Sequence, residues 1–261
     1  MNITSLSGRS ALVTGGGRGA GAVIASTLAS AGASIVLAAR TKSEVDAVAE
    51  RLSAGGARVW AFECDVSDPA SVEVLARSTA DTAGRIDILV NNAGIGFAAP
   101  LGKTSFEDWQ RVIGVNATGT FLCVRTWLPS MLEAGWGRII NIASVAGLNG
   151  DRYISAYAAS KHAVVGFTRA IAAEVASRGV TVNAICPTFL DTEMTQATLN
   201  QIVASTGRDR GSALDAIVAK SPQKRLITPE EVAASVVFLC SEHARGITGE
   251  SLVIDGGELR R

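Results

Sequence analysis

The sequence is poor in several features that would indicate a particular class of partner. Its 24 Lys and Arg residues are balanced by 24 Asp and Glu, so no net charge favours nucleic acid or an anionic membrane. It has only two histidines, which lie far apart, and a histidine-rich metal site is therefore not expected. Its four cysteines have no paired spacing, which argues against both a disulfide framework and a zinc site.

Long apolar runs are also missing, and no secretory signal is visible. No apolar stretch reaches the length needed to span a bilayer. Residues Met1–Arg9 contain no basic region followed by an apolar run. The remaining class is a globular protein of a reducing compartment, and we expect a cytoplasmic location with no membrane and no nucleic-acid partner.

Short apolar runs alternate with longer helical patterns along the chain. The runs are rich in β-branched residues, and several lack polar alternation, as strands buried on both faces should. They predict seven strands, at Ala11–Thr14, Ser34–Ala38, Val59–Glu63, Ile86–Val90, Arg138–Ile142, Val180–Ile185 and Ser251–Ile254. The helical patterns lie at Ala20–Ser30, Glu44–Leu52, Ala70–Thr82, Phe106–Leu132, Ala156–Ser177 and Pro229–Cys240. This alternation predicts one α/β domain over residues 1–261, a doubly wound parallel sheet of Rossmann type with helices on both faces.

One long segment breaks this rhythm. Residues 190–225 are polar and have only weak helical patterning. Segments of this length without regular structure are usually functional or mobile in a compact domain. We therefore predict that residues 190–225 form a lid that closes over the cofactor and the substrate.

The first predicted strand runs into a glycine-rich turn that opens a helix. Glycines let the backbone turn tightly and approach a pyrophosphate, whose charge the helix N-terminus favours. Such a turn is weak evidence alone, but its place between a strand and a helix is the context that dinucleotide binding requires. A P-loop is excluded because no Gly-Lys-Ser/Thr closes the turn. The predicted cofactor contacts in the turn are Gly15, Gly17, Arg18, Gly19, Ala20 and Gly21.

The end of the second strand predicts which cofactor is used. An NAD enzyme presents an acid to the ribose about twenty residues after the turn, whereas here the strand ends in Ala39-Arg40 and the next acid is Glu44. A carboxylate would repel a 2′-phosphate, and the Arg40 guanidinium can hold it, with Arg18 as a second cation. The pattern predicts NADP(H), the alternative being that both arginines are solvated surface charges.

Tyr157 and Lys161 lie four residues apart at the start of a long helical pattern, and so on one helix face. A free phenol is a poor base because its pKa is about 10. An ammonium about 4 Å away, in an effective dielectric of about 20, supplies about 4 kcal/mol, enough to bring the pKa to about 7. Taken alone, a pair at this spacing is usually a surface contact.

Together with other motifs, this pair makes the sequence resemble the classical short-chain dehydrogenase/reductase family over nearly the whole chain. The motifs stand in order at Thr14–Gly21, Asp65-Val66, Asn91–Gly94, Asn116, Ser144, and Tyr157 with Lys161. The resemblance implies that Tyr157 donates the proton in reduction and that Ser144 hydrogen-bonds the substrate oxygen, where negative charge develops. It implies that Lys161 holds the nicotinamide ribose and lowers the tyrosine pKa. Asn116 is implied to distort its helix and hold a water that links Lys161 to solvent.

The resemblance also implies cofactor contacts beyond the glycine turn. Asp65 and Val66 would lie against the adenine, and Asn91 would steady the floor of the site. The hydroxyl of Thr192 would contact the nicotinamide carboxamide. The family's turn after the sixth strand usually reads Pro-Gly, but here it reads Pro187-Thr188, which leaves the loop geometry and the pocket width open. The remaining expected cofactor contacts are Ala93, Gly94, Pro187 and Thr188.

The expected substrate pocket is mostly apolar, which favours an uncharged or thioester-linked ketone over a small acid. Besides Thr188, its expected lining residues are Phe97, Val145, Asn149, Tyr153, Phe189 and Leu190. The predicted function is the reversible, NADP(H)-dependent reduction of a small-molecule ketone to a secondary alcohol. The main alternative is a 3-oxoacyl-thioester reductase acting on a carrier-protein or CoA thioester, or a 3-hydroxyacyl-CoA dehydrogenase. The predicted lid has no clear arginine patch for an acyl carrier, but Arg208 and Arg210 keep this alternative open.

Two other classes of protein fit the sequence less well or not at all. A regulator that only senses NADP(H) would usually have lost Tyr157 or Lys161, and both are present. A serine hydrolase is excluded because no Gly-x-Ser-x-Gly elbow surrounds Ser144. By the same family resemblance, we expect a homotetramer or a homodimer assembled through the two long helical segments and the last strand.

Overall fold

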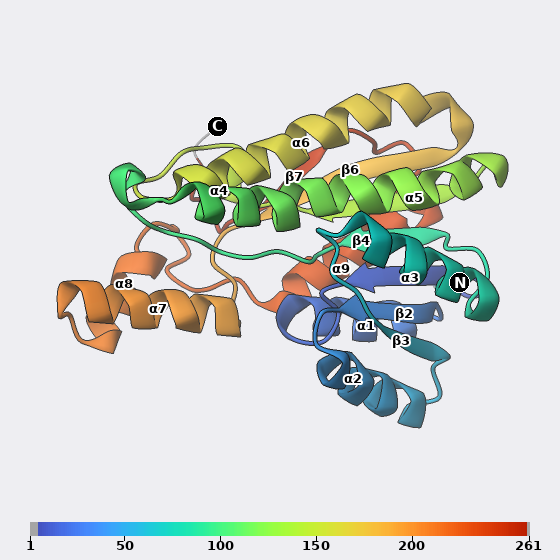
Figure 1. The fold of residues 1–261 in the computed structure, drawn as a ribbon, viewed down its shortest axis with the longest axis horizontal. Helices are drawn as coiled ribbons and strands as arrows, with labels where there is room; N and C mark the ends of the chain where they lie inside the picture. The colour runs from blue at the N-terminus through green and yellow to red at the C-terminus, as the bar shows by residue number, and fades with distance from the viewer. Residues whose placement is uncertain (1–4, 260–261) are drawn as a thin grey trace.

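The apolar runs form one seven-stranded sheet at the centre of the molecule, and the helices cover both of its faces (Figure 1). The structure is a computed structural model that describes residues 5–259, so residues 1–4 and 260–261 of the predicted domain lie outside the described part. Every paired strand runs parallel, in the order β3-β2-β1-β4-β5-β6-β7. The strands are β1 Ser10–Thr14, β2 Ser34–Ala39, β3 Val59–Glu63, β4 Ile88–Asn91, β5 Gly137–Ile142, β6 Val180–Pro187 and β7 Ser251–Ile254.

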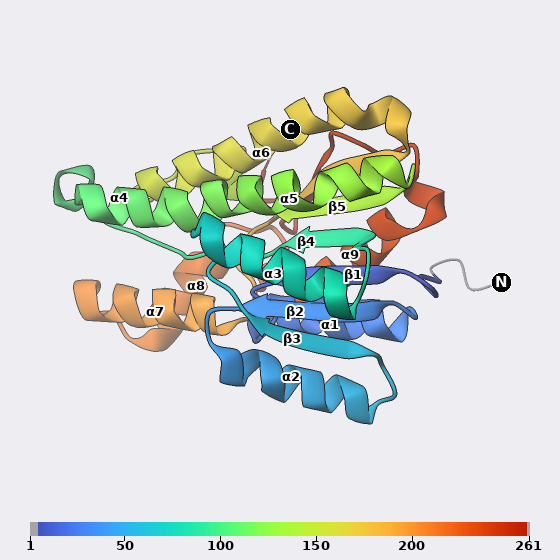
Figure 2. The same cartoon turned by 45° about the vertical axis from the view of Figure 1, so that its right-hand side comes forward.

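Alternating side chains of each strand enter two different cores, as both faces of a buried parallel sheet require. In β1, Ala11 and Val13 pack with one group of helices, while Leu12 packs with the other group. The first group is α1 Gly19–Ser30, α2 Lys42–Ala54 and α9 Pro229–Cys240. The second group contains α3 Pro69–Thr82, α5 Gly119–Glu133 and α6 Ser155–Val175, and Figure 2 shows α5 and α6 running together over the strands. The predicted fold class is confirmed.

The predicted helix Phe106–Leu132 is interrupted at its middle. It consists of α4 (Phe106–Ile113), a π-helical turn η2 (Gly114–Thr118) and α5. Asn116 is the central residue of this turn and is almost fully buried. A π-helical turn widens a helix locally, so the helix distortion that the family resemblance implied at Asn116 is present. Such turns often mark functional sites.

The segment predicted as an irregular lid is helical, which corrects the sequence-based expectation. It contains α7 (Glu193–Thr206) and α8 (Arg210–Val218), which lie at the end of the molecule toward which the strands point (Figure 1). Their patterning is weak because they bury few side chains, chiefly Leu199, Ala213 and Ile217, in a small core of their own. That the segment closes over ligands stays a prediction.

The lid leaves and rejoins the domain at one place. Leu190 and Ile227 form an isolated parallel bridge, in which Asp191 N donates to Ile227 O at 2.9 Å. Ile227 N in turn donates to Phe189 O at 3.0 Å. The two connections of the lid to the rest of the domain are thus held side by side.

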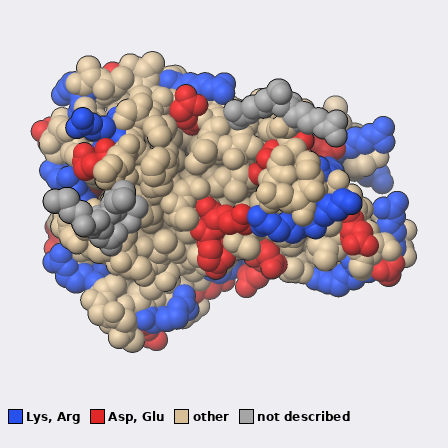
Figure 3. All heavy atoms as spheres, turned by 180° about the vertical axis from the view of Figure 1, so that it is seen from behind, with Lys and Arg blue, Asp and Glu red and all other residues tan. Residues whose placement is uncertain are grey.

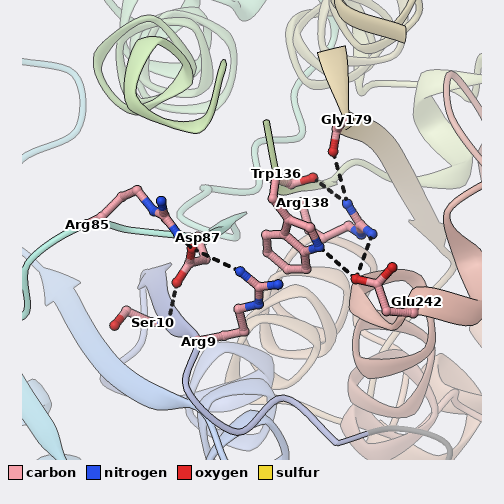
Figure 4. Close-up of polar contacts among 9 residues, drawn as sticks. Arg9, Ser10, Arg85, Asp87, Trp136, Arg138, Gly179 and Glu242 are labelled. Atoms are coloured by element: carbon pink, nitrogen blue, oxygen red, sulfur yellow. Dashed lines mark hydrogen bonds and ion pairs between the residues drawn. The ribbon is translucent and has the colours of Figure 1, made fainter. Parts of the chain in front are cut away.

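The opposite, amino-terminal edge of the sheet carries a charged cluster that is drawn in Figure 4. The buried carboxylate of Asp87 accepts hydrogen bonds from Ser10 N at 3.0 Å and from Arg85 Nη2 at 2.6 Å. Nearby, Arg138 lies with its guanidinium 4.3 Å from the centre of the Trp136 ring. Arg9 joins the two groups, since its guanidinium lies 3.5 Å from Asp87 Oδ1 and 3.6 Å from the centre of the Trp136 ring. The cluster therefore links the starts of β1, β4 and β5 and acts on stability at the edge of the sheet away from the predicted catalytic residues.

The outer surface shows no single dominant charge on the face seen from behind. Basic and acidic side chains are interspersed there, and acidic groups stand next to basic ones near its centre (Figure 3). Within the described part of the chain, no helix is both long enough and apolar enough to cross a membrane.

Candidate active site

Tyr157 and Ser144 meet at the carboxyl edge of the sheet. Tyr157 lies in the first turn of α6, and Ser144 follows the end of β5 by two residues. The Ser144 hydroxyl hydrogen-bonds with Tyr157 and accepts a further bond from Ala146 N at 3.1 Å. The structure therefore brings together the predicted proton donor and the predicted oxyanion partner, although they are separated by the whole β5–α6 loop.

Lys161 lies one helical turn beyond Tyr157 but does not bond to its hydroxyl. Its ammonium donates to the Ile142 carbonyl at 2.8 Å and stands 5.8 Å from the centre of the Tyr157 ring. Because the side chain is buried, the pKa of Lys161 falls from its ordinary value to about 8.

Burial raises the pKa of Tyr157 above its ordinary value, and the hydrogen bond with Ser144 opposes this only in part. The expected lowering of this pKa by Lys161 is therefore absent from this arrangement. The physical reason is that burial disfavours a phenolate, while the lysine ammonium is directed to a backbone carbonyl. At neutral pH the tyrosine is a protonated acid, as ketone reduction requires.

Asn116 is held by the loop that follows β4. Its Nδ2 donates to Ile95 O and to Ser160 Oγ, each at 3.0 Å, and its Oδ1 accepts from Ile95 N at 2.8 Å. A Cβ added to Gly94 would lie 3.3 Å from Asn116 Oδ1 and 3.6 Å from Lys161 Nζ. Asn116, Gly94 and Lys161 are thus neighbours, while the water expected at Asn116 stays a prediction.

The glycine turn leaves a backbone cradle that other residues would fill. Gly15 has φ +64°, and a Cβ added to Gly21 would lie 2.1 Å from the Gly15 carbonyl oxygen. Asn92 Nδ2 donates to the carbonyls of Thr14 and Gly15 at 2.9 and 3.1 Å. A cradle of this kind fits the pyrophosphate of a dinucleotide. Asn92 belongs to the Asn91–Gly94 motif, whose sequence alone indicates no role for this side chain, and only the structure shows that it fixes the turn.

The two predicted phosphate-binding arginines differ in their surroundings. Arg40 is exposed and lies near enough to Asp65 to favour its ionised form. Burial opposes that ionisation, but two hydrogen bonds from Ser67 and the charge of Arg40 leave the pKa of Asp65 below its ordinary value. Arg40 forms no ion pair with any described residue, and it is free to meet a phosphate.

Arg18 is shared with two carboxylates. Its Nη1 lies 3.3 Å from Glu193 Oε2 on α7 and 3.7 Å from Glu44 Oε1 on α2. A groove of about 560 Å³ opens beside the turn and has all three side chains in its lining. A phosphate bound by Arg18 would have to compete with these acids.

The remaining predicted cofactor residues lie around the same edge of the sheet. Asn91 donates to Asn141 Oδ1 at 2.8 Å beneath the site, and its own Oδ1 is buried without a partner in the described structure. Val66 packs against Gly119 of α5, and the Thr192 methyl approaches Gly19, since a Cβ there would lie 3.7 Å away. Thr192 therefore stands between the glycine turn and the lid.

Of the predicted substrate residues, Tyr153 stands out by its backbone. Its φ is +68°, a strained value for a residue with a side chain, and its carbonyl accepts from Ala99 N at 2.7 Å. Tyr153 is largely exposed, at the edge of the β5–α6 loop that also carries Val145 and Asn149. Phe97 lies in the facing loop, 5.9 Å beneath the Arg111 guanidinium.

Phe189 and Leu190 contribute to packing. Phe189 packs against the small core of the lid, and Leu190 packs against the core beneath α1 and α9. Their expected part in substrate binding stays a prediction.

Three contacts hold the lid against the rest of the domain, and none of them was predicted from the sequence. Gln201 Nε2 donates to Ala98 O at 3.0 Å, and Lys220 forms an ion pair with Asp151. The third is the Arg18–Glu193 pair. Each joins residues far apart in the chain, so no local pattern could have revealed them.

The chain is similar to several known proteins over nearly its whole length. Residues 15–258 match a family model described as enoyl-(acyl carrier protein) reductase. The chain is 41% identical over 98% of both chains to a 3-oxoacyl-acyl-carrier-protein reductase of a Synechocystis strain. It is 42% identical to a D-threitol dehydrogenase of Mycolicibacterium smegmatis, over 97% of this chain and 93% of the other. A crystal structure of an actinorhodin polyketide ketoreductase variant with NADPH superposes with a TM-score of 0.93 at 35% identity, covering 96% of this chain and 97% of that one.

Proposed function

Because the chain belongs to the short-chain dehydrogenase/reductase family, we propose that it catalyses the reversible, NADP(H)-dependent reduction of a ketone to a secondary alcohol. The observation that carries the proposal is the contact of Tyr157 with Ser144 beside the glycine cradle. NADPH, when bound, supplies the hydride, and the protein provides orientation and the proton.

Tyr157, Ser144 and Lys161 have different roles in the reduction. The raised pKa of Tyr157 keeps its phenol protonated at neutral pH, so it donates the proton to the ketone oxygen during reduction. The Ser144 hydroxyl hydrogen-bonds the same oxygen, where negative charge develops. Lys161, with a pKa of about 8, is mostly cationic at neutral pH; the Ile142 carbonyl accepts from its ammonium, whose remaining N–H groups would bond the expected ribose.

The preference for NADP(H) is supported by the end of β2 and by a relative. Arg40 forms no ion pair with a described residue, although its charge acts on Asp65 at longer range, and it stands where an NAD enzyme presents an acid. The ketoreductase with a similar structure holds NADPH. Arg18 would assist by leaving Glu193 and Glu44, and would therefore contribute less than Arg40.

A second candidate is the reduction of a 3-oxoacyl thioester, which the 41% identical relative favours by its name. The lid gives this candidate limited support. Arg210 donates to Asn200 Oδ1 at 2.7 Å and also to Gln196, so it is engaged within the lid. Arg208 is exposed and is the better candidate for contact with a carrier.

The protein would act as a homotetramer, or as a homodimer, in the cytoplasm. Apolar side chains on the outside of α4 and α5 support this assembly, since Phe106 is 67% exposed and Phe121 is 43% exposed. Leu252 on the edge strand β7 and Phe238 on α9 form a second exposed apolar pair. Light scattering of the purified protein would give the oligomeric state.

An activity screen tests the proposal and separates its two candidates. Purified protein would be assayed with NADPH against 3-oxoacyl thioesters, cyclic ketones and aryl ketones. Oxidation of NADPH with a free ketone, lost in Tyr157→Phe, would support the main proposal. Activity restricted to thioesters would support the second candidate, and no turnover of any carbonyl compound would contradict both.

A further inference from the structure

The tail that follows β7 places a carboxylate that no sequence motif had indicated. Thr188, which stands in place of the glycine that the family resemblance implied after Pro187, donates its hydroxyl hydrogen to Glu258 Oε2. Glu258 is half-buried, and no lysine or arginine among residues 5–259 forms an ion pair with it. A neutral donor thus orients the carboxylate, and no basic side chain among residues 5–259 neutralises its charge.

Strand register places this pair next to the reacting groups. Ile142 of β5 pairs with Ile185 of β6, and Ser144 comes two residues after Ile142, level with Pro187. Pro187 pairs with Ile254 of β7, so Thr188 lies between the Ser144 loop and the tail. Neighbouring strands are only about 4.8 Å apart.

The strand residue that precedes Pro187 lies beside the catalytic pair. Cys186 packs with Val164 and Val165 of α6 and lies close enough to influence the pKa of both Tyr157 and Lys161. Thr188 lies in the bend directly after β6, where its backbone N donates to Ile254 O at 3.1 Å. Its contact with Glu258 is therefore at the carboxyl edge of the sheet, two residues beyond Cys186.

The tail itself is fixed by a set of short contacts. The Asp255 carboxylate accepts from Gly257 N at 2.8 Å and from Leu259 N at 2.7 Å. The Gly256 carbonyl accepts from Ser221 Oγ at 3.2 Å at the end of the lid. Glu258 thus stands on a hydrogen-bonded turn between the lid and the β6 loop, and within the described part of the chain it has no basic partner.

We propose that Glu258, oriented by Thr188, is a specificity residue that selects neutral substrates carrying a second hydroxyl and rejects those carrying a carboxylate at that end. A fixed carboxylate accepts a strong hydrogen bond from a substrate hydroxyl. The same charge repels a substrate carboxylate in the low dielectric of a half-buried site. The inference rests on the proposed function and narrows its substrate class to polyols and hydroxyketones.

Three four-carbon ketones provide a matched test with NADPH. Acetoacetate carries a carboxylate, 4-hydroxybutan-2-one carries a hydroxyl at the same end, and butan-2-one carries neither. In the parent protein, kcat/KM for the hydroxyketone should exceed that for acetoacetate by at least about thirtyfold. In Glu258→Gln, kcat/KM for acetoacetate should rise about tenfold, equivalent to about 1.4 kcal/mol, while butan-2-one changes by less than about twofold.

Two further variants define the mechanism. Thr188→Val removes the hydroxyl that orients the carboxylate, so it should shift the acetoacetate-to-hydroxyketone ratio in the same direction by a smaller factor. Glu250→Gln removes an exposed carboxylate just before the other end of β7 and is the matched control, with an unchanged ratio.

The possible failures are distinguishable. If Glu258→Gln changed kcat/KM by the same factor for all three ketones, the residue would only support the fold. That result would overturn the inference and leave the proposed function intact. An acetoacetate-to-hydroxyketone ratio of kcat/KM that Glu258→Gln left unchanged would overturn the inference in the same way. A parent protein that reduces no ketone in this set or in the wider screen would overturn the proposed function and the inference together.

Discussion

Arg18 Nη1 and Glu193 Oε2 lie 3.3 Å apart and join the glycine-rich turn to the first turn of α7. The same arginine is the one that sequence reasoning assigned to a 2′-phosphate. Glu193 of the lid and the 2′-phosphate of the cofactor would therefore compete for the guanidinium of Arg18.

Glu193→Gln should strengthen NADPH binding by about threefold and leave NADH binding unchanged. The effect is small because both side chains are more than half exposed, and exposed ion pairs are worth about 1 kcal/mol or less. Fluorescence titration of each cofactor gives the two dissociation constants. Glu107→Gln, an exposed acid on α4, is the control, and equal tightening for both cofactors in Glu193→Gln would refute the competition.

The double change Ala39→Asp with Arg40→Leu should reverse the cofactor preference. We expect the parent to prefer NADPH over NADH by about a hundredfold in kcat/KM, because charge-assisted contacts are each worth about 1.5–3 kcal/mol. The new acid would bond the ribose hydroxyls and repel a 2′-phosphate. Steady-state kinetics with both cofactors checks this, and equal efficiency in the parent would show that Arg40 is only a solvated charge.

Tyr157→Phe should lower the rate of ketone reduction by at least about a thousandfold, since it removes only the transferable proton. NADPH affinity should change little because the ring remains. Rate assays and fluorescence titration on the same preparation separate the two effects. If the variant kept a tenth of the parent rate, another group would have to be the acid.

The rate of ketone reduction should fall as pH rises through about 8, because Lys161 then loses its proton while the more basic Tyr157 keeps its own. The sign follows from the two directions: burial lowers the pKa of the lysine and raises that of the tyrosine. Lys161→Met should abolish this limb and lower the rate at all pH values. The arginine in Lys161→Arg keeps its charge to higher pH, so the fall in reduction rate should move to higher pH. If the rate of Lys161→Met still fell near pH 8, Lys161 would not be the group whose titration causes the fall.

Asp87→Asn should lower the free energy of unfolding by about 2 kcal/mol, because buried hydrogen bonds to a charged group are worth about 1.5–3 kcal/mol. Arg85→Gln should cost less, since Arg85 is partly exposed. Urea denaturation gives both values. The kcat of the folded Asp87→Asn protein should stay within about twofold of the parent, because Asp87 precedes β4 at the amino-terminal edge of the sheet, whereas Ser144 follows β5 at the carboxyl edge.

Local patterns predicted the sheet and the glycine turn because their signals are contained in a few consecutive residues. The buried strands are continuous β-branched runs, and Gly15 and Gly21 meet each other within a single turn. The helices of the lid were missed because α7 and α8 bury few side chains, so their apolar periodicity is faint.

Two features of the site depended on tertiary structure and could not have come from the sequence. The pKa of Tyr157 is set by burial, which opposes the effect expected from the spacing of Tyr157 and Lys161. The Thr188–Glu258 contact joins residues 70 positions apart, and the Arg18–Glu193 contact joins residues 175 positions apart. No periodicity or motif reports on pairs at such separations.

The bridge between Leu190 and Ile227 has a consequence for how such a chain can diversify. Both ends of the lid are fixed side by side by the domain itself, so a lid of another length would close the same gap with little change in loop-closure entropy. The lid also packs around its own Leu199, Ala213 and Ile217. The segment between Leu190 and Ile227 can thus be exchanged as a unit. A different segment there would change the substrate that is reduced, while Tyr157 and Ser144 stay the same.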